Sequence, residues 1–192
     1  MSENTPNPSV LEAVRETGAL LEGHFQLASG VHSDRYLEKF NLLQWPGHTE
    51  DACRPLAAAA RELAPSTIVG PTTGGVILAY EVARQLSLRG IIAERNPEGE
   101  GRRIQRDFRL EPGERVFVVD DVLTSGGSVR DTIEAVRIAG GEPVAVGVLV
   151  DRSAGRVAFE GLPLHASMVL DLATYQPDDC LLCRDGMALT VT

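Results

Sequence analysis

The sequence predicts an α/β fold with a central parallel sheet flanked by helices. Short apolar runs rich in β-branched residues alternate with segments of helical periodicity from about residue 67 onward, as expected for successive βα units. The apolar runs are continuous, which is typical of strands buried on both faces. Two of them end in loops of glycine, threonine and serine that open a helix. Ligands bind such sheets at the carboxyl ends of the strands, so both loops are candidate sites.

The composition is that of a globular protein without a general affinity for nucleic acid or membranes. The chain has 192 residues, enough for one domain, and is 43% hydrophobic and 23% charged. Its net charge of −9 argues against a partner that needs a basic face. No apolar run approaches the length of a transmembrane helix, and the start, MSENTPNPSV, does not resemble a signal peptide. We therefore expect a cytoplasmic protein.

The first third of the chain predicts two helices with short strands between them. Residues 10–17 predict an amphipathic helix that Gly18 ends. Residues 25–27 and 35–37 have strand-like composition and are separated by turn residues. Residues 49–63 place apolar side chains on one face of a second helix.

The rest of the chain predicts the strands of the sheet. Residues 67–69, 90–94 and 143–150 are apolar runs, and residues 76–86 predict a helix between the first two. Residues 164–172 predict one more strand, which we expect to join the N-terminal segment outside the sheet.

The most informative stretch surrounds two consecutive aspartates. Residues 116–119 predict a buried strand, and Asp120 and Asp121 follow at its end, where a ligand or cation can compensate their charge. Residues 124–128 then form a loop of short hydroxyls and glycines, and Ser128 is expected to cap the helix that follows. We expect a phosphate at this helix N-terminus. At the carboxylates we expect the hydroxyls of a sugar, or the water molecules on a bound divalent cation. An ordinary strand-to-helix turn with solvated aspartates is the alternative.

This stretch carries a family resemblance. The GxxxxGK[ST] and GxGxxG phosphate signatures are absent, but VVDDVLTSGGS resembles the phosphoribosyl-pyrophosphate (PRPP) motif of the type I phosphoribosyltransferases. The resemblance implies that fold, with Asp120 and Asp121 in a catalytic role on the ribose hydroxyls. It also implies that the ribose phosphate is bound by the loop residues Thr124, Ser125, Gly126, Gly127 and Ser128.

A second loop of the same kind, GPTTGG, occupies residues 70–75. Its glycines permit close backbone approach to a second anion, although they could also serve a simple turn. In the resembling family this is the pyrophosphate loop, which implies PRPP contacts from Thr72, Thr73 and Gly74. Some family members carry a lysine where Gly74 stands, so cationic assistance must come from elsewhere in this chain.

The segment GHFQLASGVHSDRY resembles the N-terminal hood of the orotate phosphoribosyltransferases. The resemblance implies a single domain spanning residues 1–192. Within it, the hood comprises roughly residues 18–45 plus part of 160–175, and the core roughly residues 46–155. A hairpin that is only a lid on the core is the alternative.

The base-binding residues follow from the same resemblance, which implies that orotate is bound by Thr124, Arg152, Ser29 and Tyr36. Arg152 also has a physical argument, because an arginine after the strand at 143–150 suits a carboxylate or an imide edge. A salt bridge at the rim is the alternative for Arg152.

Five arginines crowd into one short segment of this acidic protein: Arg95, Arg102, Arg103, Arg106 and Arg109. The composition of residues 95–109 predicts a long mobile loop, and a basic loop suits a lid over pyrophosphate. The orotate enzymes use a loop here, with lysine and histidine, that reaches the neighbouring subunit's site. The resemblance therefore implies a homodimer and catalytic roles for Arg95 and Arg103. This loop lacks lysine and histidine, and the sequence does not say which of its arginines replaces them.

The three cysteines are Cys53, Cys180 and Cys183. A structural zinc site needs four ligands, and neither a second cysteine pair nor a metal-ligand spacing of the histidines accompanies the CLLC segment. We therefore expect reduced cysteines that pack the tail. A redox pair, or a metal shared across a dimer, is the alternative.

With the resemblance, the sequence predicts an enzyme that transfers the phosphoribosyl group of PRPP to orotate, giving orotidine 5'-phosphate and pyrophosphate in pyrimidine biosynthesis. The implied cofactor is Mg²⁺, held mainly by the substrate, with no protein ligand assigned. Two alternatives stay open: transfer to another nucleobase, and a non-catalytic regulator that senses PRPP.

Overall fold

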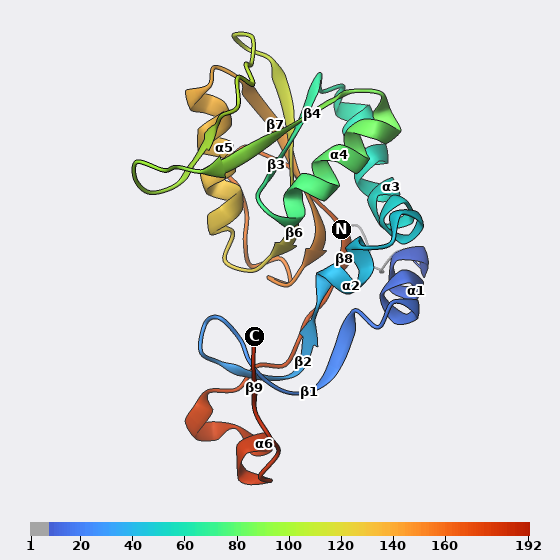
Figure 1. The fold of residues 1–192 in the computed structure, drawn as a ribbon, viewed down its shortest axis with the longest axis vertical. Helices are drawn as coiled ribbons and strands as arrows, with labels where there is room; N and C mark the ends of the chain where they lie inside the picture. The colour runs from blue at the N-terminus through green and yellow to red at the C-terminus, as the bar shows by residue number, and fades with distance from the viewer. Residues whose placement is uncertain (1–7) are drawn as a thin grey trace.

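The computed structural model describes residues 8–192, and its larger sheet has six strands (Figure 1). The strand order is β5-β4-β3-β6-β7-β8, and all neighbours are parallel except β4 and β5. The predicted α/β fold is therefore confirmed. The strands are β3 (Thr67–Pro71), β4 (Arg89–Arg95), β5 (Arg102–Ile104), β6 (Arg115–Leu123), β7 (Glu142–Asp151) and β8 (Leu164–Val169).

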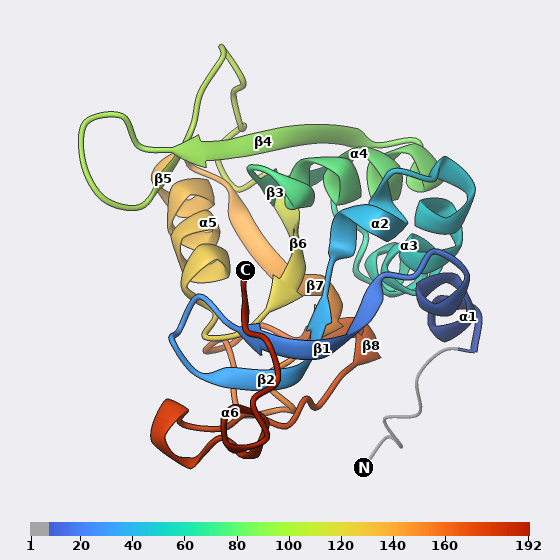
Figure 2. The same cartoon turned by 60° about the horizontal axis from the view of Figure 1, so that its bottom comes forward.

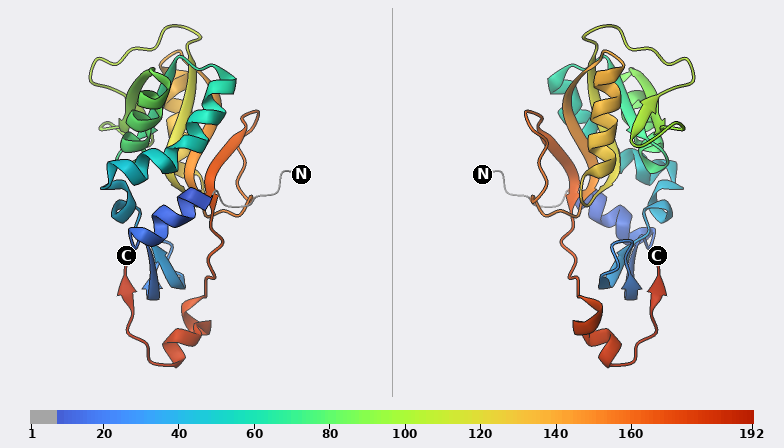
Figure 3. Two further views of the ribbon diagram at one scale, coloured as in Figure 1. Left: turned by 90° about the vertical axis from the view of Figure 1, so that its right-hand side faces the viewer. Right: turned by 90° about the vertical axis from the view of Figure 1, so that its left-hand side faces the viewer.

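Helices cover both faces of this sheet (Figure 3). α3 (Pro46–Leu63) and α4 (Gly74–Leu86) pack on one face, with α1 (Pro8–Glu16) beside α3, and α5 (Gly127–Ile138) packs on the other. Each predicted helix is present, with ends that differ by a few residues. α3 begins earlier than its apolar pattern because Pro46 stands at its first position, where a proline loses no helical hydrogen bond.

The central strand β6 contributes to two separate cores. Successive residues of a strand point to opposite faces. Phe117 accordingly packs in a cluster with Leu56 of α3, whereas Val118 packs in a second cluster with Val129 of α5. Two covered faces explain why this strand is a continuous apolar run.

The order of the strands creates a binding region. The chain runs from β3 through α4 to β4 on one side, and from β6 through α5 to β7 on the other. β3 and β6 are neighbours, so their carboxyl ends lie where the direction of winding reverses. This is the place where open α/β sheets bind ligands.

A second, smaller sheet, here called the hood sheet, has the order β2-β1-β9. It consists of β1 (Leu20–Gln26), β2 (His32–Leu37) and β9 (Thr190–Val191). Figure 2 shows it crossing below the ends of β6 and β7. The segment after β8 runs out of the core along the hood sheet and returns to it as β9 (Figure 3). It contains a short 3-10 helix (Pro177–Asp179) and α6 (Leu181–Arg184), and α2 (Lys39–Leu43) joins the hood sheet to α3.

The structure corrects the expected place of the late strand. Residues 164–172 were expected in the hood, but Leu164–Val169 is β8, paired in parallel with β7 and packed against α3. Its apolar residues serve the main core. The hood sheet takes its late strand from Thr190–Val191, which is too short to give a strand pattern.

The arginine-rich segment is also more ordered than its composition predicts. Residues 102–104 form β5 and pair with β4, so irregular structure is confined to residues 96–101 and 105–114. Across residues 8–192 none of the helices has the length and apolar character needed to cross a membrane.

Gly147 of β7 provides a test of the core packing. A Cβ there would lie 2.6 Å from the buried Phe117 ring, whereas a Cβ at Gly47, in the first turn of α3, would meet nothing within 4 Å. Gly147→Ala should therefore destabilise the protein by roughly 1–3 kcal/mol through overpacking. Gly47→Ala should be neutral or slightly stabilising. Urea unfolding of both variants measures the difference, and equal stabilities would contradict this packing.

Candidate functional site

The acidic pair, Asp120 and Asp121, lies within the last residues of β6. Both carboxylates are buried, with 5% and 7% of the residue exposed. β6 continues to Leu123, so both residues lie inside the strand and do not follow it as predicted. Asp120 Oδ1 accepts a hydrogen bond from the Asp121 N–H at 2.8 Å, and Asp121 Oδ1 accepts one from the Val122 N–H at 2.6 Å.

Burial changes the protonation of Asp120. Desolvation, followed by the charge of Asp121, raises the pKa of Asp120 from 3.8 to about 6. A smaller opposing contribution comes from Arg102. A hydroxyl-rich or cationic ligand would restore the solvation that the acidic pair has lost, which makes it a natural binding point.

The predicted pyrophosphate loop packs directly against the acidic pair. A Cβ at Gly74 would collide with Asp121 Oδ2, and one at Gly75 would lie 2.5 Å from Pro71 Cδ. With Asp121 and Pro71 placed as they are, neither position has room for a Cβ. The peptide bond between Thr72 and Thr73 is cis.

Two cations meet this region. The sequence interpretation included Arg102 in the basic lid without an individual role, and assigned no role to Lys39. Lys39 Nζ lies 2.7 Å from Asp121 Oδ2. Arg102 donates to Thr72 Oγ1 at 3.1 Å and to Ser128 Oγ at 3.1 Å, and therefore links the two predicted anion loops. Burial lowers the pKa of Arg102 from its ordinary value.

The sequence held weak signals for both cations. Lys39 is the single lysine in the chain. Arg102 and Arg103 are consecutive in β5, so their side chains point to opposite faces. Composition alone could not tell which of them faces the loops.

The other arginines of this segment do not link the two loops as Arg102 does. Arg103, expected in a catalytic role, is half-exposed and pairs with Glu98 at 2.8 Å, so the structure does not bring it to the anion loops. Arg95, the other predicted catalytic arginine, lines a cavity of about 520 Å³ together with Arg102 and Ser128. Arg106 pairs with Glu94 at 2.8 Å.

The predicted phosphate loop, Thr124–Ser128, leads into α5. Gly126 is the N-cap, with φ of 80°, in the left-handed region that glycine adopts readily. The expected cap by Ser128 is wrong, because this residue lies inside the helix and its hydroxyl accepts from Arg102 instead. The first turn has no side-chain cap, which leaves its N–H groups available to an anion.

A second cavity of about 520 Å³ adjoins the other end of this loop. It brings together all four residues predicted to bind the base. These are Ser29, Tyr36, Thr124 and Arg152, and Thr192 also lines the cavity. The Arg152 Nε atom is buried without a hydrogen-bond partner among the described residues, and desolvation lowers the pKa of this guanidinium. An unpaired buried donor of this kind favours an anionic ligand.

Comparison with known proteins agrees with this geometry. The family model described as "Phosphoribosyl transferase domain" matches residues 41–164. The chain belongs to the phosphoribosyltransferase family. Within this family it is 46% identical over 178 residues to a protein of Pelotomaculum thermopropionicum named orotate phosphoribosyltransferase, with 93% of this chain and 92% of the relative covered.

Two further phosphoribosyltransferases extend the comparison. A Thermotoga maritima protein named orotate phosphoribosyltransferase is 44% identical, with 93% of this chain and 94% of the relative covered. The crystal structure of orotate phosphoribosyltransferase from Aeropyrum pernix superposes with a TM-score of 0.73 at 30% identity, covering 84% of this chain and 93% of that one. The resemblance predicted from the sequence is confirmed.

The raised pKa of Asp120 predicts a stability effect. Between pH 3.8 and about 6 the folded state binds more protons than the unfolded state, so this carboxylate lowers stability as the pH rises. Asp120→Asn should therefore stabilise the ligand-free protein by roughly 1–3 kcal/mol above pH 6, and the gain should vanish as the pH falls towards 3.8.

Urea unfolding at a series of pH values measures this gain. Glu62→Gln, at an exposed position near the end of α3, is the control and should show no such gain. A variant Asp120→Asn that is less stable than the parent at neutral pH would contradict the electrostatic argument.

Proposed function

We propose that this enzyme transfers the phosphoribosyl group of PRPP to orotate, releasing pyrophosphate and forming orotidine 5'-phosphate for pyrimidine biosynthesis. The observation that carries the proposal is the position of Thr124–Ser128 between two cavities. One cavity holds Arg102 with Ser128, and the other holds Arg152 with the hood residues Ser29 and Tyr36. The arrangement suits an anionic sugar donor beside a base that carries a carboxylate.

The PRPP half of the site would work by positioning and electrostatics. The ribose phosphate would accept from the N–H groups at the start of α5 and from the hydroxyls of Thr124–Ser128. Asp120 and Asp121 would then face the ribose hydroxyls. As the bond to pyrophosphate loosens, positive charge grows on the sugar ring, and the two nearby carboxylates stabilise it. This mechanism needs no covalent protein nucleophile.

Arg102 would stabilise the leaving pyrophosphate. In the free protein its guanidinium donates hydrogen bonds to the Thr72 and Ser128 hydroxyls. We expect the same two hydroxyls to contact PRPP. The incoming phosphates can replace these neutral acceptors with charged ones, and arginine binds charged oxygens more strongly. Arg95, in the same cavity, would add a second positive charge.

Orotate would be oriented by Arg152. Its carboxylate supplies the acceptor that the buried Nε lacks, and Ser29, Tyr36 and Thr124 line the same cavity. A neutral nucleobase would leave this donor unpaired, and that cost favours orotate over bases without a carboxylate.

Mg²⁺ is the proposed cofactor, and the carboxylates offer little room for it as direct ligands. Both oxygens of Asp121 are engaged, by the Val122 N–H and by Lys39, and Asp120 Oδ1 accepts from the Asp121 N–H. We therefore propose that the ion is held mainly by the oxygens of PRPP. Bound there, it would neutralise charge on pyrophosphate.

We further propose a cytoplasmic homodimer in which the hairpin tip reaches the neighbouring site. Free cysteines at all three positions suit a reducing compartment. The hairpin of β4 and β5 carries Glu98 in its turn and Arg103 on β5, both half or more exposed. Arg102, beside the turn, faces this chain's own loops.

The first test is an orotate assay. Loss of orotate absorbance on adding PRPP and Mg²⁺ should occur with the wild type, and Arg152→Ala should lower kcat/KM on the order of 30- to 1,000-fold because a buried charged hydrogen bond is lost. Arg137→Ala, at an exposed position of α5, is the matched control and should retain activity. A wild type that is inert towards orotate but active with another base would refute the proposed substrate.

The two neighbouring arginines give a second test. Arg102→Gln should lower kcat/KM for PRPP by about 100-fold or more, as expected for the loss of one charge-stabilising donor. Arg103→Gln removes only an exposed ion pair and should stay within a few fold of wild type. Steady-state kinetics and thermal unfolding of both variants separate a catalytic effect from misfolding. Equal losses would show that Arg102 has no special role.

A further inference from the structure

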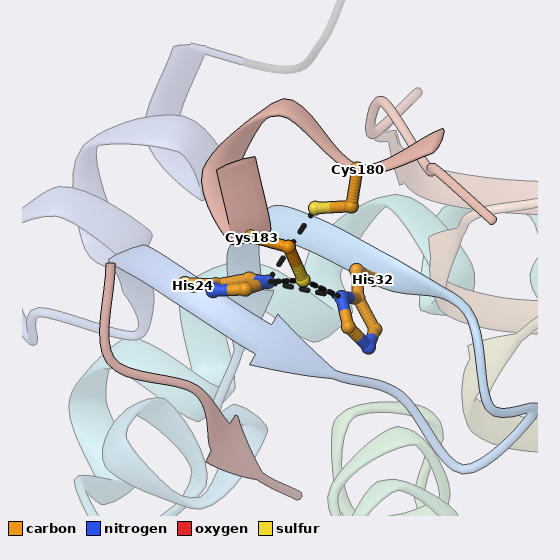
Figure 4. Close-up of side chains that lie close together, drawn as sticks. All are labelled: His24, His32, Cys180 and Cys183. Atoms are coloured by element: carbon orange, nitrogen blue, oxygen red, sulfur yellow. Dashed lines mark hydrogen bonds between the residues drawn. The ribbon is translucent and has the colours of Figure 1, made fainter. Parts of the chain in front are cut away.

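Two histidines and two cysteines from distant parts of the chain converge beneath the hood sheet. His24 lies on β1 and His32 on the neighbouring β2, while Cys180 is the N-cap of α6 and Cys183 lies within that helix (Figure 4). One ligand atom from each of the four lies within 4.8 Å of all the others. Among residues 8–192 this is the one such cluster of possible metal ligands.

The separations match a tetrahedral metal site. With Zn–N near 2.0 Å and Zn–S near 2.3 Å, tetrahedral angles place two nitrogens about 3.3 Å apart and a nitrogen about 3.5 Å from a sulfur. In the structure His24 Nε2 lies 3.0 Å from His32 Nδ1. Three of the four nitrogen–sulfur separations are 3.3, 3.5 and 3.7 Å.

Hydrogen bonding alone does not account for this cluster. His24 Nδ1 lies 2.9 Å from the carbonyl oxygen of Met187, which can only accept, so Nδ1 carries the proton. In the neutral ring Nε2 is then an acceptor with a single lone pair. It faces His32 Nδ1, Cys180 Sγ and Cys183 Sγ together, and one lone pair cannot serve three donors.

The surroundings also suit a metal ligand. A histidine that binds a metal usually donates its other N–H to an oxygen, which fixes the ring and its tautomer, and Met187 O takes this part for His24. His24, His32 and Cys180 are buried, and Cys183 is exposed, which leaves a route for the ion. Two thiolates and two imidazoles in a closed set are typical of structural zinc.

We propose that His24, His32, Cys180 and Cys183 bind a structural zinc ion within one chain. The ion fastens the segment after β8 to the hairpin of β1 and β2. On this proposal the further ligands that the CLLC segment needs lie about 150 positions earlier in the chain.

The zinc site would stabilise one wall of the base cavity. Residues 27–31 connect β1 to β2, and all of them except Gly30 line that cavity. Thr192 lines it too, and its hydroxyl donates to Gln26 O at 2.9 Å. An ion that joins α6 to this hairpin holds both parts of the wall in place. It lies outside the acidic pair and the anion loops, so it serves structure and takes no part in the transfer.

Metal analysis of the full-length protein tests the proposal. The protein, purified without a metal-binding tag or chelator, should contain one zinc ion per chain when measured by inductively coupled plasma mass spectrometry. Cys183→Ser and His24→Asn should lose it. Cys53→Ala, which removes the cysteine outside the cluster, and His48→Asn are matched controls and should retain it.

A second measurement does not depend on the variants folding. Wild-type protein reconstituted with Co²⁺ should show the strong visible absorption of tetrahedral cobalt and a sulfur-to-cobalt charge-transfer band. Removal of the metal should increase hydrogen exchange in residues 180–192 and leave the exchange of β6 unchanged. Wild type that binds neither Zn²⁺ nor Co²⁺, or that contains a disulfide between Cys180 and Cys183, would overturn the proposal.

Discussion

The burial of two adjacent carboxylates at the end of β6 is the constraint on which the active region depends. Like charges this close in a dry environment are costly, and the raised pKa of Asp120 expresses that cost. Two cations from elements at the periphery of the fold offset this charge. Lys39 comes from the connection between the hood sheet and the core, and Arg102 comes from the β4–β5 hairpin. The acidic pair therefore fixes where both of these peripheral elements must lie.

The parts of the fold that repeat a simple pattern could be predicted from the sequence. Continuous apolar runs predicted the central strands, because both faces of the sheet are covered by helices. Glycine-rich loops predicted the carboxyl ends of the neighbouring strands β3 and β6. Ser29, Tyr36, Thr124 and Arg152 were expected together from the family resemblance, and the structure places them around one cavity. Their roles towards orotate remain a proposal.

What could not be predicted depends on contacts between distant segments. The choice between Arg102 and Arg103 rests on which face of β5 points at the loops, and the register of a three-residue strand leaves no pattern in the sequence. β8 lies in the main sheet, although it was expected in the hood, because an apolar run shows that a strand is buried but not in which sheet. The histidines and cysteines beneath the hood sheet are not spaced along the sequence as metal ligands usually are. They come close only because folding brings β1, β2 and α6 together.

The late return of the chain to the hood sheet affects how the protein folds during its synthesis. All six strands of the main sheet are complete at Val169, so the core can form as soon as that part of the chain has left the ribosome. The hairpin of β1 and β2 is made first but must wait, because His32 pairs with Tyr175 and Gln26 accepts from Thr192, 166 positions later. Contacts of such long range form slowly. The half of the protein that carries the Thr72 and Thr124–Ser128 loops would thus form before the cavity around Arg152 closes, and the hood would be the last part to fold.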